Sequence, residues 1–432
     1  LLVHAAARLV GIGGYGRFQY HNNQLHCEDV PLSQLAAAEG TPLYVYSQAI
    51  ILDNAQTYLK QAGNGALVCY AVKANGNPTI LRLLAKTGLG ADVTCGGELF
   101  LALHAGFAPD KIIYSGVGKL RHEIEEALRA NIRALHVESE MELAQIAAIA
   151  TERQQMARIG VRVNPDIPVE THPYISTGAA QHKFGVSAET AVTLLHFAAQ
   201  HPWLQPVGLA AHIGSQILDL EPFAASTRFL VGLADELSAG GVRLDYLDVG
   251  GGLGVAYASE KWKVKSEKIE AWVSMVSEPV QRDGYGLVME PGRSIVAEAG
   301  VLLTQVVYTK SQGAKQFAIV DAAMNDLLRP TLYGAYHEIL PVDLTQRRGG
   351  AEVSYDVVGP ICETGDFLAK DRALPPLASG DLLAITHVGA YGFAMSSNYN
   401  GRLRPAELLV DGNQIHRICQ RQTYQHLLNH IG

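Results

Sequence analysis

The sequence predicts an α/β fold in which a (β/α)₈ barrel is followed by a second, β-rich domain. Eight short runs of apolar and β-prone residues recur up to residue 293, and segments with helical spacing of apolar residues separate most of them. After residue 293 the alternation stops, and strands separated by turn residues follow. The alternating part spans roughly 225 residues, close to the usual size of such a barrel, so a closed barrel is favoured over an open doubly wound sheet.

Each element is predicted from its own pattern. The eight barrel strands are expected at 67–74, 90–95, 111–116, 133–139, 158–164, 206–214, 246–252 and 287–293. Helices are expected at 77–87, 97–105, 120–130, 139–152, 187–200 and 224–239. Strands of the second domain are expected at 300–309, 317–321, 351–358, 381–387 and 407–410, and residues 18–27 add a strand to it. This divides the chain into an N-terminal segment (1–40) that joins the β-domain, a barrel (41–295) and a C-terminal β-domain (296–432).

Composition restricts the classes of partner. The 432 residues are 48% hydrophobic and carry a net charge of −8 without a long basic block, which argues against nucleic acid and anionic membranes and favours small molecules. No stretch approaches the roughly 20 apolar residues of a membrane span, and residues 1–20 lack a tripartite signal, so we expect a cytoplasmic protein. The five cysteines lack CxxC pairing, which predicts reduced thiols and no metal site.

Lys73 is the first candidate functional residue, because it follows an apolar, β-prone run within residues 68–75. Burial among apolar neighbours lowers the pKa of a lysine, and a neutral amine can form a Schiff base with an aldehyde. The alternative is an ordinary lysine at a strand end with its ammonium in solvent. Functional residues of a (β/α)₈ barrel lie at the carboxyl ends of its strands, and this position favours the reactive lysine.

Three further strand ends bring candidate residues to the same face. His212 ends the sixth strand, three glycines (250–252) end the seventh, and Glu290 ends the eighth. Backbone N–H groups of glycines can surround a phosphate, which in such barrels commonly binds after strands seven and eight. Glu290 is suited to face a pyridine nitrogen and keep it protonated, as the chemistry of pyridoxal 5′-phosphate (PLP) requires. Each feature taken singly also has an ordinary explanation: His212 as a structural histidine, the glycines as a tight turn, and Glu290 as a solvated acid.

Ordered motifs along nearly the whole chain carry a family resemblance. They are YAVKAN (70–75), GGEL (96–99), HKFG (182–185), HIGSQ (212–216), DVGGG (248–252), EPGR (290–293), MNDLLRP (324–330), YGAYH (333–337), GPICETGD (359–366) and GAYG (389–392). By these motifs the chain resembles the fold-type III PLP-dependent decarboxylases, and most closely those acting on meso-2,6-diaminopimelate to form L-lysine. Thr364 and Cys95 depart from the family pattern, and neither touches an expected catalytic role.

The resemblance implies a role for each site residue. Lys73 would hold PLP through a Schiff base, His212 would stack on the ring, Glu290 would meet the pyridine nitrogen, and Cys362 would reprotonate the product carbon across a dimer interface. The remaining cofactor contacts implied are Asp92, Ser215, Gly251, Gly252, Gly292, Arg293 and Tyr391. Without its flanking motif, Cys362 would be read as a packing thiol.

Substrate choice is argued partly from charge. The far end of meso-diaminopimelate carries an ammonium and a carboxylate, so Arg329 and Arg293 are expected to clamp the carboxylate while Glu363 takes the ammonium. Tyr333 and Tyr391 complete the expected substrate contacts. The alternative for the charged residues is surface ion pairs, worth at most about 1 kcal/mol each.

Three alternatives remain at this point. A related decarboxylase would act on ornithine, arginine or carboxynorspermidine, and Arg329 argues against the first two more than the third. A racemase of the alanine-racemase type shares the barrel and the lysine but fits Glu290 poorly. A catalytically dead homologue would serve as a binding protein, although retention of both Lys73 and Cys362 speaks against it.

Overall fold

The computed structural model describes residues 17–169, 183–257, 265–346 and 351–429. The chain forms two compact units. The barrel unit comprises Asn54–Val255 and Val264–Ser294, and the β-unit comprises Leu1–Asp53, Ala256–Lys263 and Ile295–Gly432. His182, the first residue of the predicted HKFG motif, lies outside the described residues.

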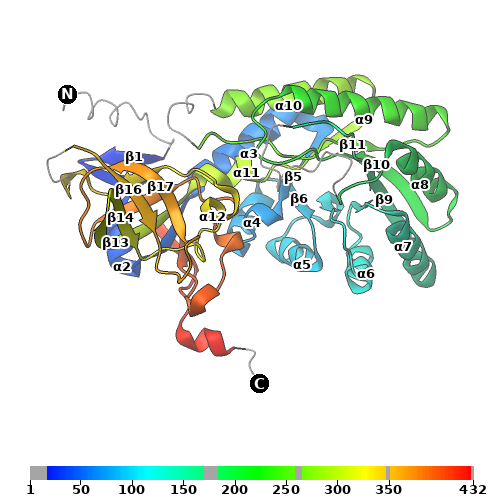
Figure 1. The fold of residues 1–432 in the computed structure, drawn as a ribbon. Coiled ribbons are helices and arrows are strands. Elements are labelled where there is room, and N and C mark those ends of the chain that lie inside the picture. Colours follow the sequence, from blue (N-terminus) through cyan, green and yellow to red (C-terminus); the bar gives the residue numbers. More distant parts are fainter. Residues whose placement is uncertain (1–16, 170–182, 258–264, 347–350, 430–432) are drawn as a thin grey trace. The chain divides into compact units, whose positions relative to one another are not determined.

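Eight parallel strands close into a barrel in the order β10-β11-β12-β5-β6-β7-β8-β9. Figure 1 labels β5, β6, β9, β10 and β11 of this barrel. Each of the eight strands coincides with a predicted run, because strands buried on both faces are nearly continuously apolar. This confirms the predicted barrel. The strands are β5 (Ala66–Ala71), β6 (Gly90–Val93), β7 (Ile112–Tyr114), β8 (Ala134–Val137), β9 (Ala157–Arg162), β10 (Leu204–Ala210), β11 (Tyr246–Asp248) and β12 (Gly286–Met289).

Helices connect successive barrel strands. The six predicted helices form, and several begin at a side-chain cap: Asn77, Ser139 and Ser187 each accept a hydrogen bond from a backbone N–H in the first helical turn. Two long helices were not predicted, α3 (Gln48–Ala62) and α10 (Lys265–Arg282), of which α10 contains Pro279. The others are α4 (Pro78–Lys86), α5 (Gly96–Ala105), α6 (Arg121–Ala130), α7 (Glu140–Arg153), α8 (Ala188–Gln200) and α9 (Glu221–Ala239).

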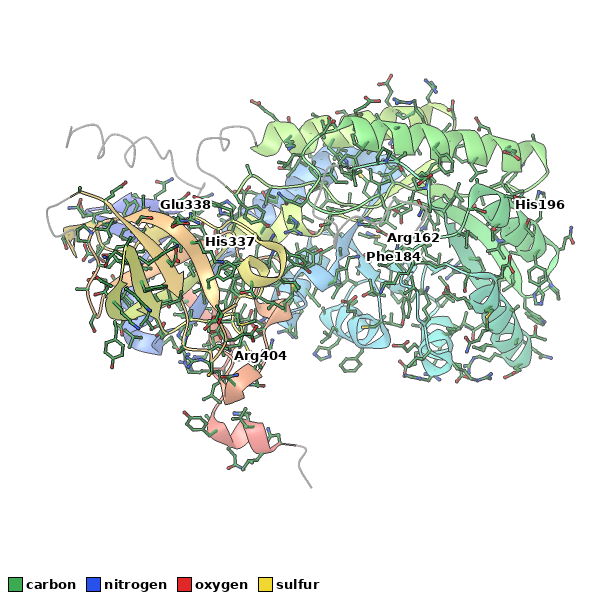
Figure 2. The ribbon with its side chains drawn as sticks, viewed as in Figure 1. Arg162, Phe184, His196, His337, Glu338 and Arg404 are labelled. Atoms are coloured by element: carbon green, nitrogen blue, oxygen red, sulfur yellow. The ribbon has the colours of Figure 1, made fainter. Side chains whose placement is uncertain are left out.

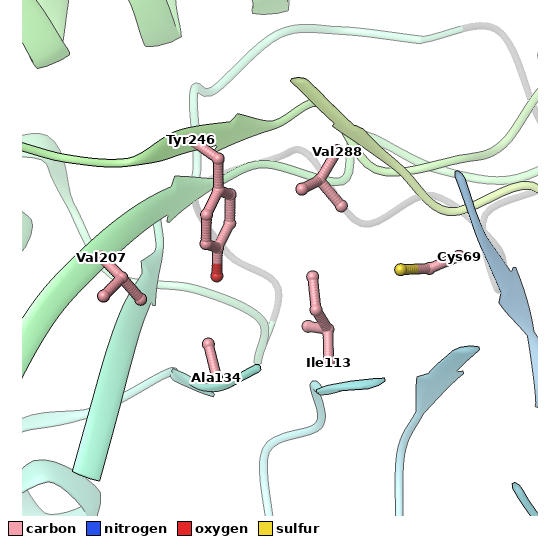
Figure 3. Packing of buried hydrophobic residues seen from close by; sticks show 6 residues of the cluster. All are labelled: Cys69, Ile113, Ala134, Val207, Tyr246 and Val288. Atoms are coloured by element: carbon pink, nitrogen blue, oxygen red, sulfur yellow. The ribbon is translucent and has the colours of Figure 1, made fainter. Parts of the chain in front are cut away.

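Tyr246 fills the barrel interior. Its ring lies in a buried cluster with side chains from five other strands (Figure 3). Glycines on β10 and β9 make room for the Tyr246 and His136 rings: a Cβ at Gly208 would lie 2.3 Å from the Tyr246 ring, and one at Gly160 would lie 2.4 Å from His136. The Tyr246 hydroxyl and His136 Nε2 are 2.8 Å apart, so these two buried polar groups form a hydrogen bond with each other.

The β-unit is built on two sheets, which confirms the predicted second, β-rich domain. Residues 18–27, expected to add one strand, instead form a hairpin within a separate three-stranded sheet, β1 (Phe18–His21), β2 (Gln24–Cys27) and β3 (Val30–Pro31). The larger mixed sheet runs β17-β16-β14-β13-β4-β19-β20, with β18 paired to β13 and β15 to β18. Its strands are β4 (Leu43–Ser47), β13 (Gly300–Gln312), β14 (Lys315–Val320), β15 (Ile339–Pro341), β16 (Val353–Val358), β17 (Phe367–Leu374), β18 (Leu382–Thr386), β19 (Ala406–Asp411) and β20 (Gln414–Cys419).

All five cysteines are free thiols, as predicted. Within the described parts of the chain, no helix has both the length and the apolar character needed to cross a membrane.

Candidate active site

Lys73 lies just beyond the end of β5 and pairs with a buried acid on the next strand. Its Nζ donates to Asp92 Oδ2 at 2.8 Å, and Asp92 is fully buried near the end of β6. Burial opposes ionisation of Asp92, but the Lys73 ammonium and its hydrogen bond outweigh burial and hold the pKa of Asp92 below its usual range. The apolar run around Lys73 did not predict this contact, which places a charged lysine and its counterion together at the barrel mouth.

His212 follows β10 and is held as a neutral ring. Its Nδ1 accepts a hydrogen bond from the Gly251 N–H at 3.1 Å, which leaves the ring proton on Nε2. Burial, together with the nearby cations Arg162 and Lys73, lowers the pKa of His212 to about 3. At neutral pH the His212 ring is therefore uncharged, and the hydrogen bond from Gly251 fixes its orientation. Both properties suit an aromatic stacking partner.

A cavity of about 400 Å³ opens at this end of the barrel. Arg162 lines it beside Phe184 (Figure 2), with its guanidinium carbon 4.8 Å from the centre of the Phe184 ring. The Arg162 side chain is also paired to Glu138. Such a volume suits a small organic molecule. The lining residues are Lys73, Thr94, Ser115, Gly116, Val117, Gly118, His136, Arg162, Phe184, Ala211, His212 and Glu290.

Glu290 reaches this cavity from the end of β12 and lies close to a second buried carboxyl group, Asp248, with one oxygen of each within 4.8 Å of the other. Ser115 Oγ also donates to Glu290 Oε1 at 3.3 Å. Burial first, and then the negative neighbour, raises the pKa of Glu290 well above its usual range, and burial raises that of Asp248. Two buried carboxyl groups this close disfavour the doubly ionised state, because each negative charge opposes ionisation of the other.

His136 completes this buried cluster, since one ligand atom from each of His136, Asp248 and Glu290 lies within 4.8 Å of the others. Burial lowers the pKa of His136 to about 3, so its ring is neutral. The sequence did not predict the cluster, because its members come from three strands far apart in the chain. Our expectation of no metal stays a prediction.

The glycine run is shaped for close backbone approach. A Cβ at Gly251 would lie 2.0 Å from the Glu290 carbonyl oxygen, and one at Gly252, where φ is +102°, would lie 2.1 Å from the Gly214 carbonyl oxygen. Beside the run, Arg293 Nη2 donates to Ser215 Oγ at 3.1 Å. A bare backbone turn beside a buried guanidinium fits the phosphate end of PLP, and the cavity with Lys73 and Glu290 fits its ring.

Substitution of Gly251 tests this fit. We expect Gly251→Ala to lower stability by about 1–3 kcal/mol, because the new methyl group must displace backbone, and to weaken PLP binding. The measurement is urea unfolding beside a PLP titration. Gly232→Ala is the matched control, since Gly232 lies in α9 and a Cβ added there would meet open space. Equal PLP affinity in the Gly251 and Gly232 variants would contradict the assigned role of the run.

Cys362 and Glu363 lie in the β-unit, between β16 and β17. Cys362 is exposed, and its backbone N–H donates to Asn400 Oδ1 at 3.1 Å. Glu363 Oε2 accepts a hydrogen bond from the Tyr399 hydroxyl at 2.7 Å. These contacts hold the backbone beside Cys362 and orient the Glu363 carboxylate, which the sequence motif did not foretell.

Arg329 begins the short helix α12 (Arg329–Tyr333) and is buried, with 4% of its surface exposed. Its Nη1 lies 2.8 Å from His337 Nε2, and its guanidinium carbon lies 4.7 Å from the centre of the Tyr257 ring. Tyr333 ends the same helix, and Tyr391 has a left-handed backbone with φ +56°. Joint action of these residues with Arg293 and the other barrel residues stays a prediction.

Comparison with known proteins identifies the family. Residues 49–297 match the pyridoxal-dependent decarboxylase, pyridoxal binding domain. The chain is 45% identical over 410 residues to the diaminopimelate decarboxylase of Aquifex aeolicus, covering 95% of this chain and 96% of that one. It is 48% identical over 411 residues to that of Pseudomonas aeruginosa, covering 95% and 97%. The chain belongs to the diaminopimelate decarboxylase family.

Solved structures of diaminopimelate decarboxylases agree with this membership. The Helicobacter pylori enzyme complexed with L-lysine has a TM-score of 0.86 at 44% identity, covering 92% of this chain and 98% of that one. The M. jannaschii enzyme in co-complex with L-lysine has a TM-score of 0.90 at 35% identity, covering 96% and 97%. The predicted family, its decarboxylase activity and its PLP cofactor are thereby confirmed.

Proposed function

We propose that this protein removes carbon dioxide from meso-2,6-diaminopimelate to give L-lysine, the last step of lysine biosynthesis, with PLP as its cofactor. The observation that carries the proposal is the 45–48% identity that extends over 95% of the chain and therefore includes both the barrel unit and the β-unit. A match confined to the barrel would support PLP binding without supporting a choice of substrate.

The barrel residues fit the cofactor. Bound PLP supplies a conjugated, electron-accepting ring next to the bond that breaks. Lys73 would hold it through its amine, beside Asp92, and the neutral His212 ring would pack against one face. Glu290 would hold a proton at the pyridine nitrogen. The expected phosphate contacts are Ser215, Gly251, Gly252, Gly292, Arg293 and Tyr391.

The β-unit residues are assigned to the substrate and to proton return. Arg329, with Arg293, binds the distal carboxylate as a forked donor, and Glu363 binds the distal ammonium. Tyr333 and Tyr391 supply further contacts to the substrate. Cys362 Sγ supplies the proton that replaces carbon dioxide, and it acts on the site of a partner chain in a homodimer.

A substrate panel tests the proposal. Purified protein with PLP is assayed for carbon dioxide release from meso-diaminopimelate, ornithine, arginine and carboxynorspermidine. We expect carbon dioxide release from meso-diaminopimelate alone, with L-lysine as the product. Only this substrate carries at its far end both a carboxylate for Arg329 and an ammonium for Glu363. Turnover of another substrate in its place would refute the assignment of Arg329 and Glu363, while leaving the barrel chemistry in place.

A further inference from the structure

His337 is buried in the β-unit and contacts Arg329. It lies between α12 and β15, next to Glu338 (Figure 2), and it is fully buried. Two backbone contacts fix its place: the Thr386 N–H donates to the Glu338 carbonyl at 2.9 Å, and β15 pairs with β18 directly afterwards. His337 therefore lies in a short connection that backbone contacts tie to β18.

Two obligate partners fix the protonation of the His337 ring. Its Nδ1 lies 2.8 Å from the Thr386 carbonyl oxygen, which can only accept, so Nδ1 carries the hydrogen. Its Nε2 lies 2.8 Å from Arg329 Nη1, and a guanidinium can only donate, so Nε2 presents a lone pair. The ring is the neutral tautomer that accepts a hydrogen bond from Arg329.

Arg329 is held on a second side by Tyr257. The guanidinium lies 4.7 Å from the Tyr257 ring, and that ring meets His337 edge-on, with 5.1 Å between the ring centres. A histidine and a tyrosine face restrain the guanidinium without neutralising it, whereas a carboxylate in the place of His337 would compete with a bound carboxylate for the same charge.

We propose that His337 is a positioning residue for substrate specificity, which aims the Arg329 guanidinium at the carboxylate on the far end of the substrate. This inference rests on the proposed function, because it assumes that Arg329 meets that carboxylate. His337 does not touch the reacting atoms. Its loss is expected to act on recognition of the distal carboxylate and to spare the chemical step.

Two ligands that differ by one group isolate this effect. L-lysine keeps the distal carboxylate of meso-diaminopimelate, and cadaverine is L-lysine without that carboxylate. Inhibition constants are measured for both ligands with PLP-loaded protein, beside KM and kcat for meso-diaminopimelate. A residue that only supports the fold would weaken both ligands together or lower kcat, whereas a residue that aims Arg329 weakens only the ligand with the carboxylate.

Three variants test the contribution of the His337 ring. His337→Leu removes the acceptor, and we expect the inhibition constant of L-lysine and the KM to rise about tenfold, with that of cadaverine and kcat nearly unchanged. His337→Gln restores an acceptor near Nε2 and is expected to recover most of the loss. His387→Gln is the matched control, because His387 is buried and packs on the same Tyr257 ring but the contact to Arg329 is made by His337.

The outcomes are distinguishable. Equal weakening of L-lysine and cadaverine in His337→Leu, or no change in either, overturns the proposal for His337. Arg329→Lys keeps the positive charge but loses the forked donor geometry of the guanidinium, and it tests the role of Arg329 separately from that of His337. If Arg329→Lys removes discrimination between the two ligands and His337→Leu does not, only the role of His337 is refuted. Absence of lysine formation by the unaltered protein would refute the proposed function itself.

Discussion

Lys73→Ala is expected to abolish decarboxylation, with a loss of at least about a thousandfold in kcat, because no other group replaces a covalent amine. The variant should also lose the visible absorbance band of the lysine-bound cofactor. Turnover of meso-diaminopimelate and an absorbance scan are the two measurements.

Two controls accompany this substitution. Lys86→Ala removes an exposed lysine of α4 and should leave both readouts unchanged. Lys73→Arg keeps a cation beside Asp92 and should be as inactive as Lys73→Ala, which separates covalent attachment from simple charge pairing. Full activity in either Lys73 variant would contradict the role assigned to this residue.

Mixed dimers are expected to recover activity that neither parent shows. Cys362→Ala should lower turnover by about 10²–10⁴, the usual contribution of a proton donor. If Cys362 serves the site of a partner chain, equal mixing of Cys362→Ala and Lys73→Ala chains after dissociation restores about a quarter of normal activity, because half of the dimers are hybrids and each hybrid has one intact site.

The control is a mixture of Lys73→Ala with the double variant Lys73→Ala/Cys362→Ala, which contains no intact site in any combination. Sedimentation of each mixture establishes whether dimers have formed. Hybrid dimers without recovered activity would show that Cys362 does not act across the interface.

The barrel strands were predictable because each is buried on both faces and therefore consists mostly of apolar residues. Strand β20 shows the reverse case: four of its six residues are exposed, so no alternation of apolar and polar residues marks it, and it was not predicted. Helix α10 was missed although it has 18 residues, and its Pro279 is a residue that usually argues against a helix interior.

The candidate site was predictable where a motif lies at the end of a predicted strand, as for Lys73, His212 and Glu290. The contacts between such residues were not predictable. Asp248 and Glu290 lie more than forty positions apart, and the raised pKa of each depends on burial at the ends of neighbouring strands. The proposed role of His337 likewise depends on the fold, which brings the Thr386 carbonyl oxygen to the Nδ1 atom of this ring.

The central claim is that PLP is attached to Lys73 within the barrel of a diaminopimelate decarboxylase. Borohydride reduction of the PLP-loaded protein followed by peptide mapping tests it most directly, because reduction makes the attachment permanent. We expect one phosphopyridoxyl group per chain, on the peptide that contains Lys73, with loss of lysine formation. Labelling of another lysine, such as Lys119, which is buried and bound to Glu142, would contradict it.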